Sequence, residues 1–367
     1  MFGRLYWGEL RKQTSGGAII TLSVITVVLA LLMAVLFTAF NDLVNGVEEG
    51  IRDSLNSESG VTVGVNFDTG APAVSSTGQS YTQEEVLTTL NYLYAELEAW
   101  ELQKEEEGYD YYRGSDYIYY VKGEIAFFEY LRDNELYGVR IGVMRDGAIA
   151  SGEVTAEMFV TLMRSILFLL PLIYASIAAG STFADEFKSG TIKLVLTRPV
   201  GVNALTTAKL LAAFTHAVAA YAAMFLLLVV LGYSFFPAEN VRAVFMFNNS
   251  ALTLAPSSAA LGIGFTTDLI MLLSYTVIAF FVGVVTKNRV VAIITPIILV
   301  DVVGGIISLA GLGRFFISNA LDWGQFVGIS STVTGGADFF ISLPVWAVYM
   351  AAMLVLSYFV VKRRDAV

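Results

Sequence analysis

Four ionisable residues stand inside or at the edges of long apolar stretches of this sequence, and they are the first candidates for chemistry. They are Arg164, His216, Asp268 and Asp301. An ionisable side chain at the centre of a bilayer costs at least about 2.5–3.5 kcal/mol on insertion scales unless it faces protein or water. Such residues therefore indicate a transport path, a proton relay or a contact between helices.

The positions of these residues suggest different roles. Asp301 follows Arg289 by 12 residues, which places it about 18 Å along a helix that rises 1.5 Å per residue. We interpret it as part of a translocation path or a dimer seam, with an interhelical hydrogen bond as the alternative. His216 is interpreted as a packed helix contact. Arg164 and Asp268 are both expected near the outer boundary, where they could form an ion pair, although snorkelling would explain Arg164 without one.

Catalytic motifs of soluble enzymes are missing from the sequence. None of the 32 glycines precedes a lysine, so a phosphate-binding P-loop cannot occur, and there is neither a G-x-S-x-G nor an H-E-x-x-H motif. With one histidine and no cysteine, we predict no catalytic residue, no metal site and no cofactor bound by this chain. If transport is driven by ATP, the ATPase must be another polypeptide.

The elements that position these residues are predicted to be membrane spans. The chain is 56% hydrophobic and only 15% charged, whereas soluble domains carry about 25% charged residues. A transmembrane helix needs about 20 mostly apolar residues. Six stretches qualify, and the first is too long for a signal peptide and is interpreted as a retained anchor. The predicted spans are residues 16–40, 158–183, 205–236, 269–286, 290–309 and 345–361.

The distribution of charge predicts the orientation. An N-terminal arm (1–15), a loop (184–204) with the following Lys209, the Lys287–Arg289 turn and a tail (362–367) contain 12 basic and four acidic residues. The positive-inside rule makes these segments cytoplasmic. The opposite side carries 27 acidic and 10 basic residues. We therefore expect a multi-pass protein of the plasma (cytoplasmic) membrane with both termini inside. The net charge of −10 argues against a nucleic-acid partner.

The outer side receives residues 41–157, 237–268 and 310–344. The first is long enough for a domain. Thr82 and Glu85 form a capping box that opens a helix, a second helix is expected over 122–136, and alternation predicts strands at 61–68 and 139–143. The fold class is an all-α polytopic membrane protein with six transmembrane helices and a large, mainly α (minor β) extracytoplasmic domain between spans one and two.

Tyrosine is concentrated in this outer segment, with 11 of the 18 between Tyr81 and Tyr137. An acidic, aromatic surface could recognise a cationic amphipathic molecule. Tyrosines that pack with the hydroxyl toward water near the membrane or a partner give the same pattern.

The cytoplasmic loop carries the most informative motif. Asp185 and Glu186 stand at the membrane exit, Ser189-Gly190 interrupts the helix, and Thr191 can cap a new one. The apolar segment that follows is too short to span a bilayer. It can dock into a partner's groove or lie on the lipid surface.

This loop resembles that of the membrane subunits of ATP-binding-cassette exporters of the type-two permease class, whose pattern is E-x-x-x-G-T-x-K-x-x-L-x-x-P with a later lysine. The matching residues are Glu186, Gly190, Thr191, Lys193, Leu196, Pro199 and Lys209, with Asp185 and Arg198 in the same segment. The resemblance implies a coupling helix that docks onto a pair of ATPase subunits, which bind ATP and Mg²⁺, and a second permease subunit in a homo- or heterodimer.

Further features are similar to that family: the amphipathic arm 1–15 as a connecting helix, an aromatic and basic tail, and a re-entrant or interfacial segment at 310–344. The 117-residue outer segment departs from the family, where that connection is short. The implied function is export of a substrate such as an amphipathic drug, peptide or lipid-like molecule. An ion-coupled secondary transporter with Asp301 and His216 as a relay, and a sensor or immunity protein, stay open as alternatives.

Overall fold

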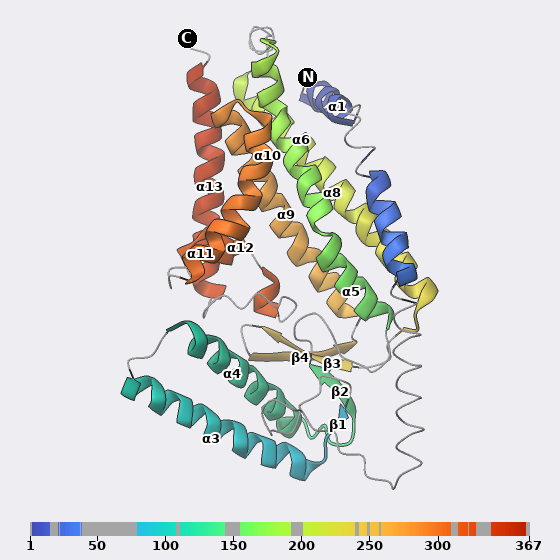
Figure 1. Cartoon of the computed structure of the whole chain (residues 1–367), viewed down its shortest axis with the longest axis vertical. Helices are drawn as coiled ribbons and strands as arrows, with labels where there is room; N and C mark the ends of the chain where they lie inside the picture. The colour runs from blue at the N-terminus through green and yellow to red at the C-terminus, as the bar shows by residue number, and fades with distance from the viewer. Residues whose placement is uncertain are drawn as a thin grey trace.

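The computed structural model describes residues 2–14, 21, 23–36, 38, 79–107, 111–143, 155–191, 201–238, 242–247, 250–256, 258–309, 315–321, 323–327 and 339–364. Long helices form a bundle, and a small sheet with two helices lies across one end of it (Figure 1). Both chain termini lie at the opposite end. We call these the sheet end and the terminal end.

Three helices are long and apolar enough to cross a membrane. They are α8 (Val202–Phe235), α9 (Ala259–Thr286) and α13 (Phe339–Arg364). A fourth crossing results if α5 (Ala156–Leu167) and α6 (Leu169–Lys188), which meet at a 41° bend, form one broken span. The chain is therefore a mostly helical, membrane-associated protein.

Two shorter apolar helices coincide with the remaining predicted spans. One covers Ser23–Leu36, inside the span predicted at 16–40. The other begins as α10 (Arg289–Ile297), continues as the π-helical turn η1 (Ile298–Val303) and ends in α11 (Gly304–Leu309). The described part of the first helix and the apolar part of the second are each shorter than a full crossing.

The bend between α5 and α6 was not predicted, since 158–183 reads as one apolar run. Pro171 stands at the third position of α6. It has no backbone N–H for the carbonyl one turn earlier, and its ring crowds that carbonyl, so a helix bends at this point. Thr155 caps the start of α5 by accepting a hydrogen bond from the Met158 amide at 3.3 Å.

Helix α9 starts ten residues before the predicted span at 269–286. Thr266, Thr267 and Asp268 interrupt the apolar pattern, but the two threonine hydroxyls donate to carbonyls of the same helix. The helix ends at Thr286, and the cap residue Lys287 adopts a left-handed conformation with φ 56°. Asn288 then caps α10 by accepting from the amides of Val290 and Val291. The chain therefore turns at Lys287 and Asn288, within the predicted 287–289 segment, and Arg289 already belongs to α10.

The sheet end joins two distant parts of the chain. The strands are β1 (Gln79–Ser80), β2 (Arg140–Val143), β3 (Arg242–Phe247) and β4 (Ser250–Pro256), in that order across the sheet. β2 runs parallel to β3, and both outer pairs are antiparallel. The connection at 237–268, for which no strands were predicted, thus contributes half of the sheet.

Two helices, α3 (Gln83–Glu107) and α4 (Tyr111–Asp133), pack on each other, and α4 lies against the sheet. Their shared core includes Val86, Phe128, Leu131, Ile141 and Val244. The capping box is confirmed: the Thr82 amide donates to Glu85 at 2.8 Å and the Glu85 amide donates to Thr82 at 3.3 Å. The second helix starts 11 residues before its predicted position. The predicted strand at 61–68 lies outside the described residues.

The terminal end carries α1 (Phe2–Thr14), which matches the predicted arm and contacts α8. The segment at 310–344, predicted to be re-entrant or interfacial, contains α12 (Ile317–Leu321), the 3₁₀ turn η3 (Trp323–Val327) and the start of α13. Helices α6 and α9 cross closely, because a Cβ added at Gly283 would lie 2.6 Å from the Gly180 carbonyl oxygen.

Candidate functional site

The first candidate site is a cluster of four ionised side chains at the terminal end. Glu186 Oε1 accepts from Lys209 Nζ and from Lys12 Nζ, each at 2.8 Å. Glu9 Oε2 lies 3.0 Å from Lys209 Nζ. We call Glu9, Lys12, Glu186 and Lys209 the terminal cluster. Two carboxylates and two ammonium groups make it neutral, as charges removed from water require.

Burial differs sharply between the two lysines. The Lys209 side chain is 0% exposed and that of Glu186 is 4% exposed, whereas that of Lys12 is 56% exposed. Lys209 also donates to the Thr182 carbonyl at 3.4 Å and lies over the Phe183 ring at 5.2 Å. It therefore joins α8 to α6 from within, while Lys12 ties α1 to α6 from outside.

Neighbouring acidic side chains stabilise the positive charge of Lys12. Burial lowers the pKa of its ammonium group, but the hydrogen bond and charge of Glu186, together with the charges of Glu9 and Asp185, raise it more. The net pKa lies above the ordinary 10.5. Its contribution to stability is thus complete below about pH 10.5 and is lost only as the pH rises through the raised pKa.

The loop motif starts directly after this cluster. Helix α6 ends at Lys188, and Gly190 follows with φ +71°, so the predicted helix break is confirmed. The Thr191 hydroxyl hydrogen-bonds to the Ser189 hydroxyl at 2.8 Å. Asp185 lies 3.7 Å from Arg289 at the start of α10. The rest of the predicted motif, Lys193, Leu196, Arg198 and Pro199, lies outside the described residues.

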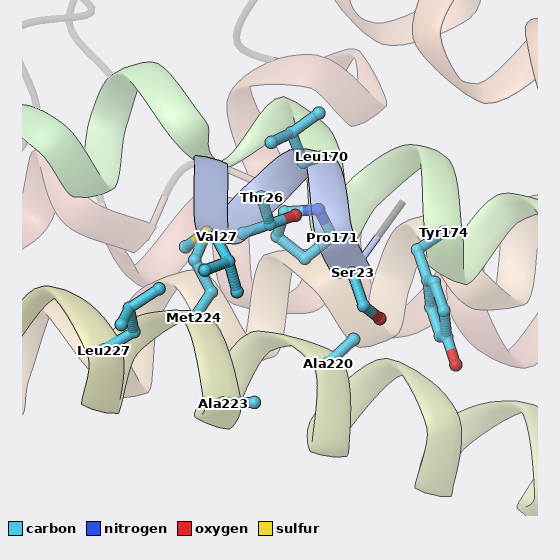
Figure 2. A pocket seen from close by; sticks show the side chains of 10 residues that line it. All are labelled: Ser23, Thr26, Val27, Leu170, Pro171, Tyr174, Ala220, Ala223, Met224 and Leu227. Atoms are coloured by element: carbon cyan, nitrogen blue, oxygen red, sulfur yellow. The ribbon is translucent and has the colours of Figure 1, made fainter. Parts of the chain in front are cut away.

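A cavity of about 270 Å³ lies between helix 23–36, α6 and α8 (Figure 2). Its lining residues are Ser23, Thr26, Val27, Leu170, Pro171, Tyr174, Ala220, Ala223, Met224 and Leu227. None of them is charged. In Figure 2 the side chains of Ser23 and Tyr174 lie toward one end and those of Met224 and Leu227 toward the other. The cavity therefore has a polar end and an apolar end.

His216 lies beside this cavity, one turn before Ala220 on α8, and its ring centroid is 6.4 Å from that of Tyr174. Its Nδ1 is 2.8 Å from the Ala212 carbonyl oxygen, which can only accept, so Nδ1 carries the proton. Nε2 is buried and has no hydrogen-bond partner among the described residues. The predicted packed histidine is confirmed, with one unsatisfied nitrogen.

The second charged site lies toward the sheet end. Arg164 of α5 forms an ion pair with Asp268 of α9, and the Tyr221 hydroxyl of α8 donates to the same carboxylate oxygen at 2.8 Å. Arg164 Nη1 also lies 3.3 Å from the Gly264 carbonyl. The Arg164 side chain is 5% exposed, so the snorkelling alternative is wrong and the ion pair is present.

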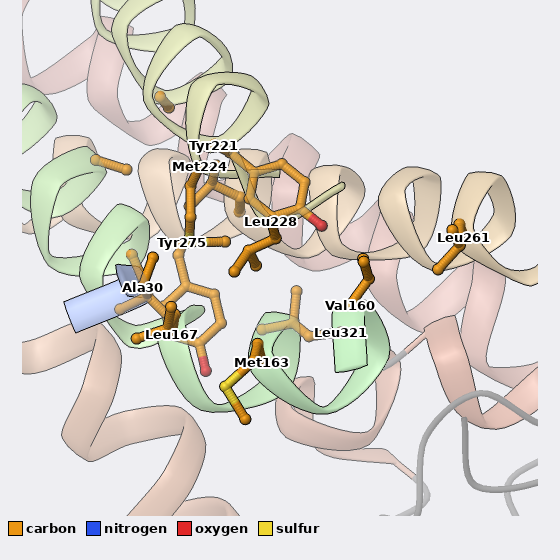
Figure 3. Close-up of a cluster of buried hydrophobic side chains, with 14 of the residues drawn as sticks. Ala30, Val160, Met163, Leu167, Tyr221, Met224, Leu228, Leu261, Tyr275 and Leu321 are labelled. Carbon is orange, nitrogen blue, oxygen red and sulfur yellow. The ribbon is translucent and has the colours of Figure 1, made fainter. Parts of the chain in front are cut away.

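Tyr221 was missed by the sequence analysis. Figure 3 shows it in the apolar core, near Met224 and Leu228 of its own helix. Its ring stacks on Phe265 with centroids 5.2 Å apart. An isolated tyrosine in an apolar run is a weak signal, because tyrosine is also typical of the membrane interface.

Asp301 lies in the π-helical turn η1, seven residues after Ile294 and five after Pro296. π-turns inside helices are frequent at functional sites. Its side chain lies outside the described ones. Within the described ranges no group of three or more His, Asp or Glu side chains could hold a metal ion.

Comparisons with known proteins place the chain in a family. Residues 128–367 match the model of DUF2705, described as a protein of unknown function. The match begins within α4 and includes Glu186, Lys209, Arg164 and Asp268, while α1 and helix 23–36 precede it. No curated protein and no solved structure matches. Because the family model covers more than half of the chain, the protein belongs to the DUF2705 family.

Proposed function

We propose that this chain is the permease subunit of an ATP-driven exporter and couples to a separate ATPase through the loop at 184–204. In this proposal helix 23–36 and the α10–α11 segment also cross the bilayer, which gives six spans. Both termini and the loop are cytoplasmic in the plasma membrane, and residues 41–157 are extracytoplasmic. A pair of ATPase subunits supplies ATP and Mg²⁺, and a second permease subunit completes the pore.

The terminal cluster is the observation that carries this proposal. Glu186 lies two residues before the end of α6, and the loop leaves from that end. Through Lys209 and Lys12 the same carboxylate is bound to α8 and α1. A force applied to the loop would therefore move three helices together, as coupling between an ATPase and a translocation path requires.

The start of the loop also suits docking to a partner. Ser189, Gly190 and Thr191 are exposed, and nothing lies within 4 Å of a Cβ added at Gly190. The φ of +71° at Gly190 cannot be adopted by proline, which is restricted to about −65°. Gly190→Pro therefore redirects the loop without disturbing a contact inside the bundle.

Co-purification tests the proposal. The tagged chain is co-expressed with the ATP-binding-cassette ATPases of its host and extracted in mild detergent. We expect the ATPase to co-purify with the parent chain and to be lost with Gly190→Pro. ATP turnover of the complex should be abolished by Glu186→Ala. Glu157→Gln is the matched control, since Glu157 is also buried but lies at the sheet end, bound to Tyr233 at 2.8 Å.

Two results would contradict the proposal. One is a chain that inserts in the membrane but retains no ATPase when the two are co-expressed. The other is a complex in which Gly190→Pro and Glu186→Ala leave ATP turnover at the level of the Glu157→Gln control.

A further inference from the structure

The cavity between helix 23–36, α6 and α8 is built like a ligand site. Helix 23–36 packs closely at Ala30 and Ala34, which are 0% and 2% exposed. Nearer its start, Ser23, Thr26 and Val27 instead border the cavity. The facing side of α8 contributes two small residues, Ala220 and Ala223, beside the larger Met224 and Leu227. Small residues on one wall and a bend beside the other therefore keep the space open.

The bend on the second wall has a covalent cause. Pro171 lines the cavity, and the 41° change of direction lies just before it. Because proline prevents a straight helix here, α5 and α6 cannot close onto helix 23–36 by straightening. Pro171 therefore helps to keep the cavity open.

The polar end of the cavity contains unused hydrogen-bonding capacity. Tyr174 lines this end, and the residue is only 8% exposed. Behind it lies His216, whose buried Nε2 lacks a donor within the part of the chain that the structure describes. Buried polar groups in proteins are nearly always paired, so the unpaired His216 nitrogen beside a lining tyrosine indicates that this end of the cavity is suited to a polar group.

We propose that this cavity binds a small, uncharged amphiphile whose hydroxyl group pairs with Tyr174 while its apolar body lies against Leu170, Met224 and Leu227. None of the described lining residues is charged, which excludes an ionised ligand because it would lose its hydration without a counter-charge. A cavity of about 150 Å³ is known to hold benzene. A volume of 270 Å³ therefore suits a body of about two fused rings.

The site differs from the ATPase-docking loop in place and in chemistry. It lies about midway along α8 and is bordered by no member of the terminal cluster. Binding requires neither ATP nor a partner chain, so it can be tested on the full chain alone and can fail or succeed independently of the proposed export function.

The test uses 1-naphthol as the probe, with the full chain in lipid nanodiscs and empty nanodiscs as the background for partitioning. Naphthalene lacks the hydroxyl, and 1-naphthoate is ionised. We expect saturable binding of 1-naphthol and none of 1-naphthoate. Tyr174→Phe should lower the affinity for 1-naphthol by about 2- to 10-fold, the value of one hydrogen bond. It should change the affinity for naphthalene by less than about 2-fold. Tyr174→Phe keeps the ring, so the fold is retained.

A second variant tests the apolar end. Ala223→Phe places a ring in the cavity and should lower the affinities for both 1-naphthol and naphthalene by at least about 10-fold, the equivalent of about 1.4 kcal/mol. Ala219→Phe is the matched control, because Ala219 is an exposed alanine one turn earlier on α8 that does not line the cavity. It should leave both affinities unchanged.

Three outcomes would overturn the proposal. Equal losses of affinity for 1-naphthol and naphthalene in Tyr174→Phe would show that Tyr174 does not bind the hydroxyl group of the ligand. Equal effects of Ala223→Phe and Ala219→Phe would place the probe elsewhere. Absence of probe binding, together with a phospholipid that native mass spectrometry finds on the parent chain but not on Ala223→Phe, would assign the cavity to an acyl chain of the bilayer.

Discussion

Replacing Lys209 with methionine removes one of the two cations of the terminal cluster and leaves the length of the side chain almost unchanged. Lys12→Met is its matched control. Both ammonium groups lie 2.8 Å from the same oxygen, Glu186 Oε1. The two lysines differ in burial, with 0% and 56% of the side chain exposed. The pair of variants therefore separates the effect of burial from that of distance.

The expected magnitudes follow from this difference. Removing one partner of a buried ion pair costs about 3–5 kcal/mol, because the other charge is left uncompensated away from water. An exposed ion pair contributes at most about 1 kcal/mol. Lys209→Met leaves the Glu186 and Glu9 carboxylates with only Lys12, so we expect a loss of about 3 kcal/mol in the free energy of unfolding. Lys12→Met should cost less than about 1 kcal/mol.

The double variant Glu186→Gln/Lys209→Met provides the decisive comparison. It removes one charge of each sign and keeps the cluster neutral. Its cost should be smaller than the sum of the two single variants by at least about 1.5 kcal/mol, since contacting residues couple by 0.5–3 kcal/mol. The assay is reversible unfolding in mixed micelles with increasing dodecyl sulfate, followed by tryptophan fluorescence.

The reasoning fails if Lys209→Met and Lys12→Met destabilise the protein equally. Strict additivity in the double variant would refute it as well, because Glu186 and Lys209 would then not stabilise each other in the folded protein.

Three more predictions concern other parts of the molecule. Gly283→Ala should cost about 1–3 kcal/mol in the same unfolding assay, because the new Cβ would overlap a backbone oxygen of α6. Gly262→Ala is the control: it has open space around it and should stabilise α9 by up to about 1 kcal/mol. Equal effects of the two variants on stability would contradict the close crossing of α6 and α9. Thr82→Ala should lower hydrogen-exchange protection at the start of α3, because hydrogen bonds from the Thr82 amide and hydroxyl lower the pKa of Glu85 below 4.5. The cap should therefore be intact above pH 4.5 and be lost as the pH falls through the lowered pKa. A Glu85 titration midpoint at or above 4.5, measured by carboxyl NMR, would refute this prediction. Tyr221→Phe should cost about 1.5–3 kcal/mol, the value of a hydrogen bond to a charged group, and an unchanged unfolding curve would show that the buried ion pair does not need it.

Local patterns in the sequence were sufficient for features that depend on neighbouring residues. The capping box located the start of α3 within a residue. The Ser189-Gly190 break, the 287–289 turn and the long apolar α8 were also predicted, since caps, left-handed residues and apolar length act over a few residues of one chain segment.

Contacts between distant segments could not be derived in this way. Arg164 and Asp268 are 104 residues apart, and the strands β2 and β3 are separated by α5, α6 and α8. Whether such groups meet depends on the crossing angles and rotations of whole helices, which hydrophobic periodicity leaves open. The same holds for the terminal cluster. The sequence supplied Glu9, Lys12, Glu186 and Lys209 as separate charges, and the arrangement of α1, α6 and α8 made them one neutral, mostly buried group, because charges that leave water must be paired.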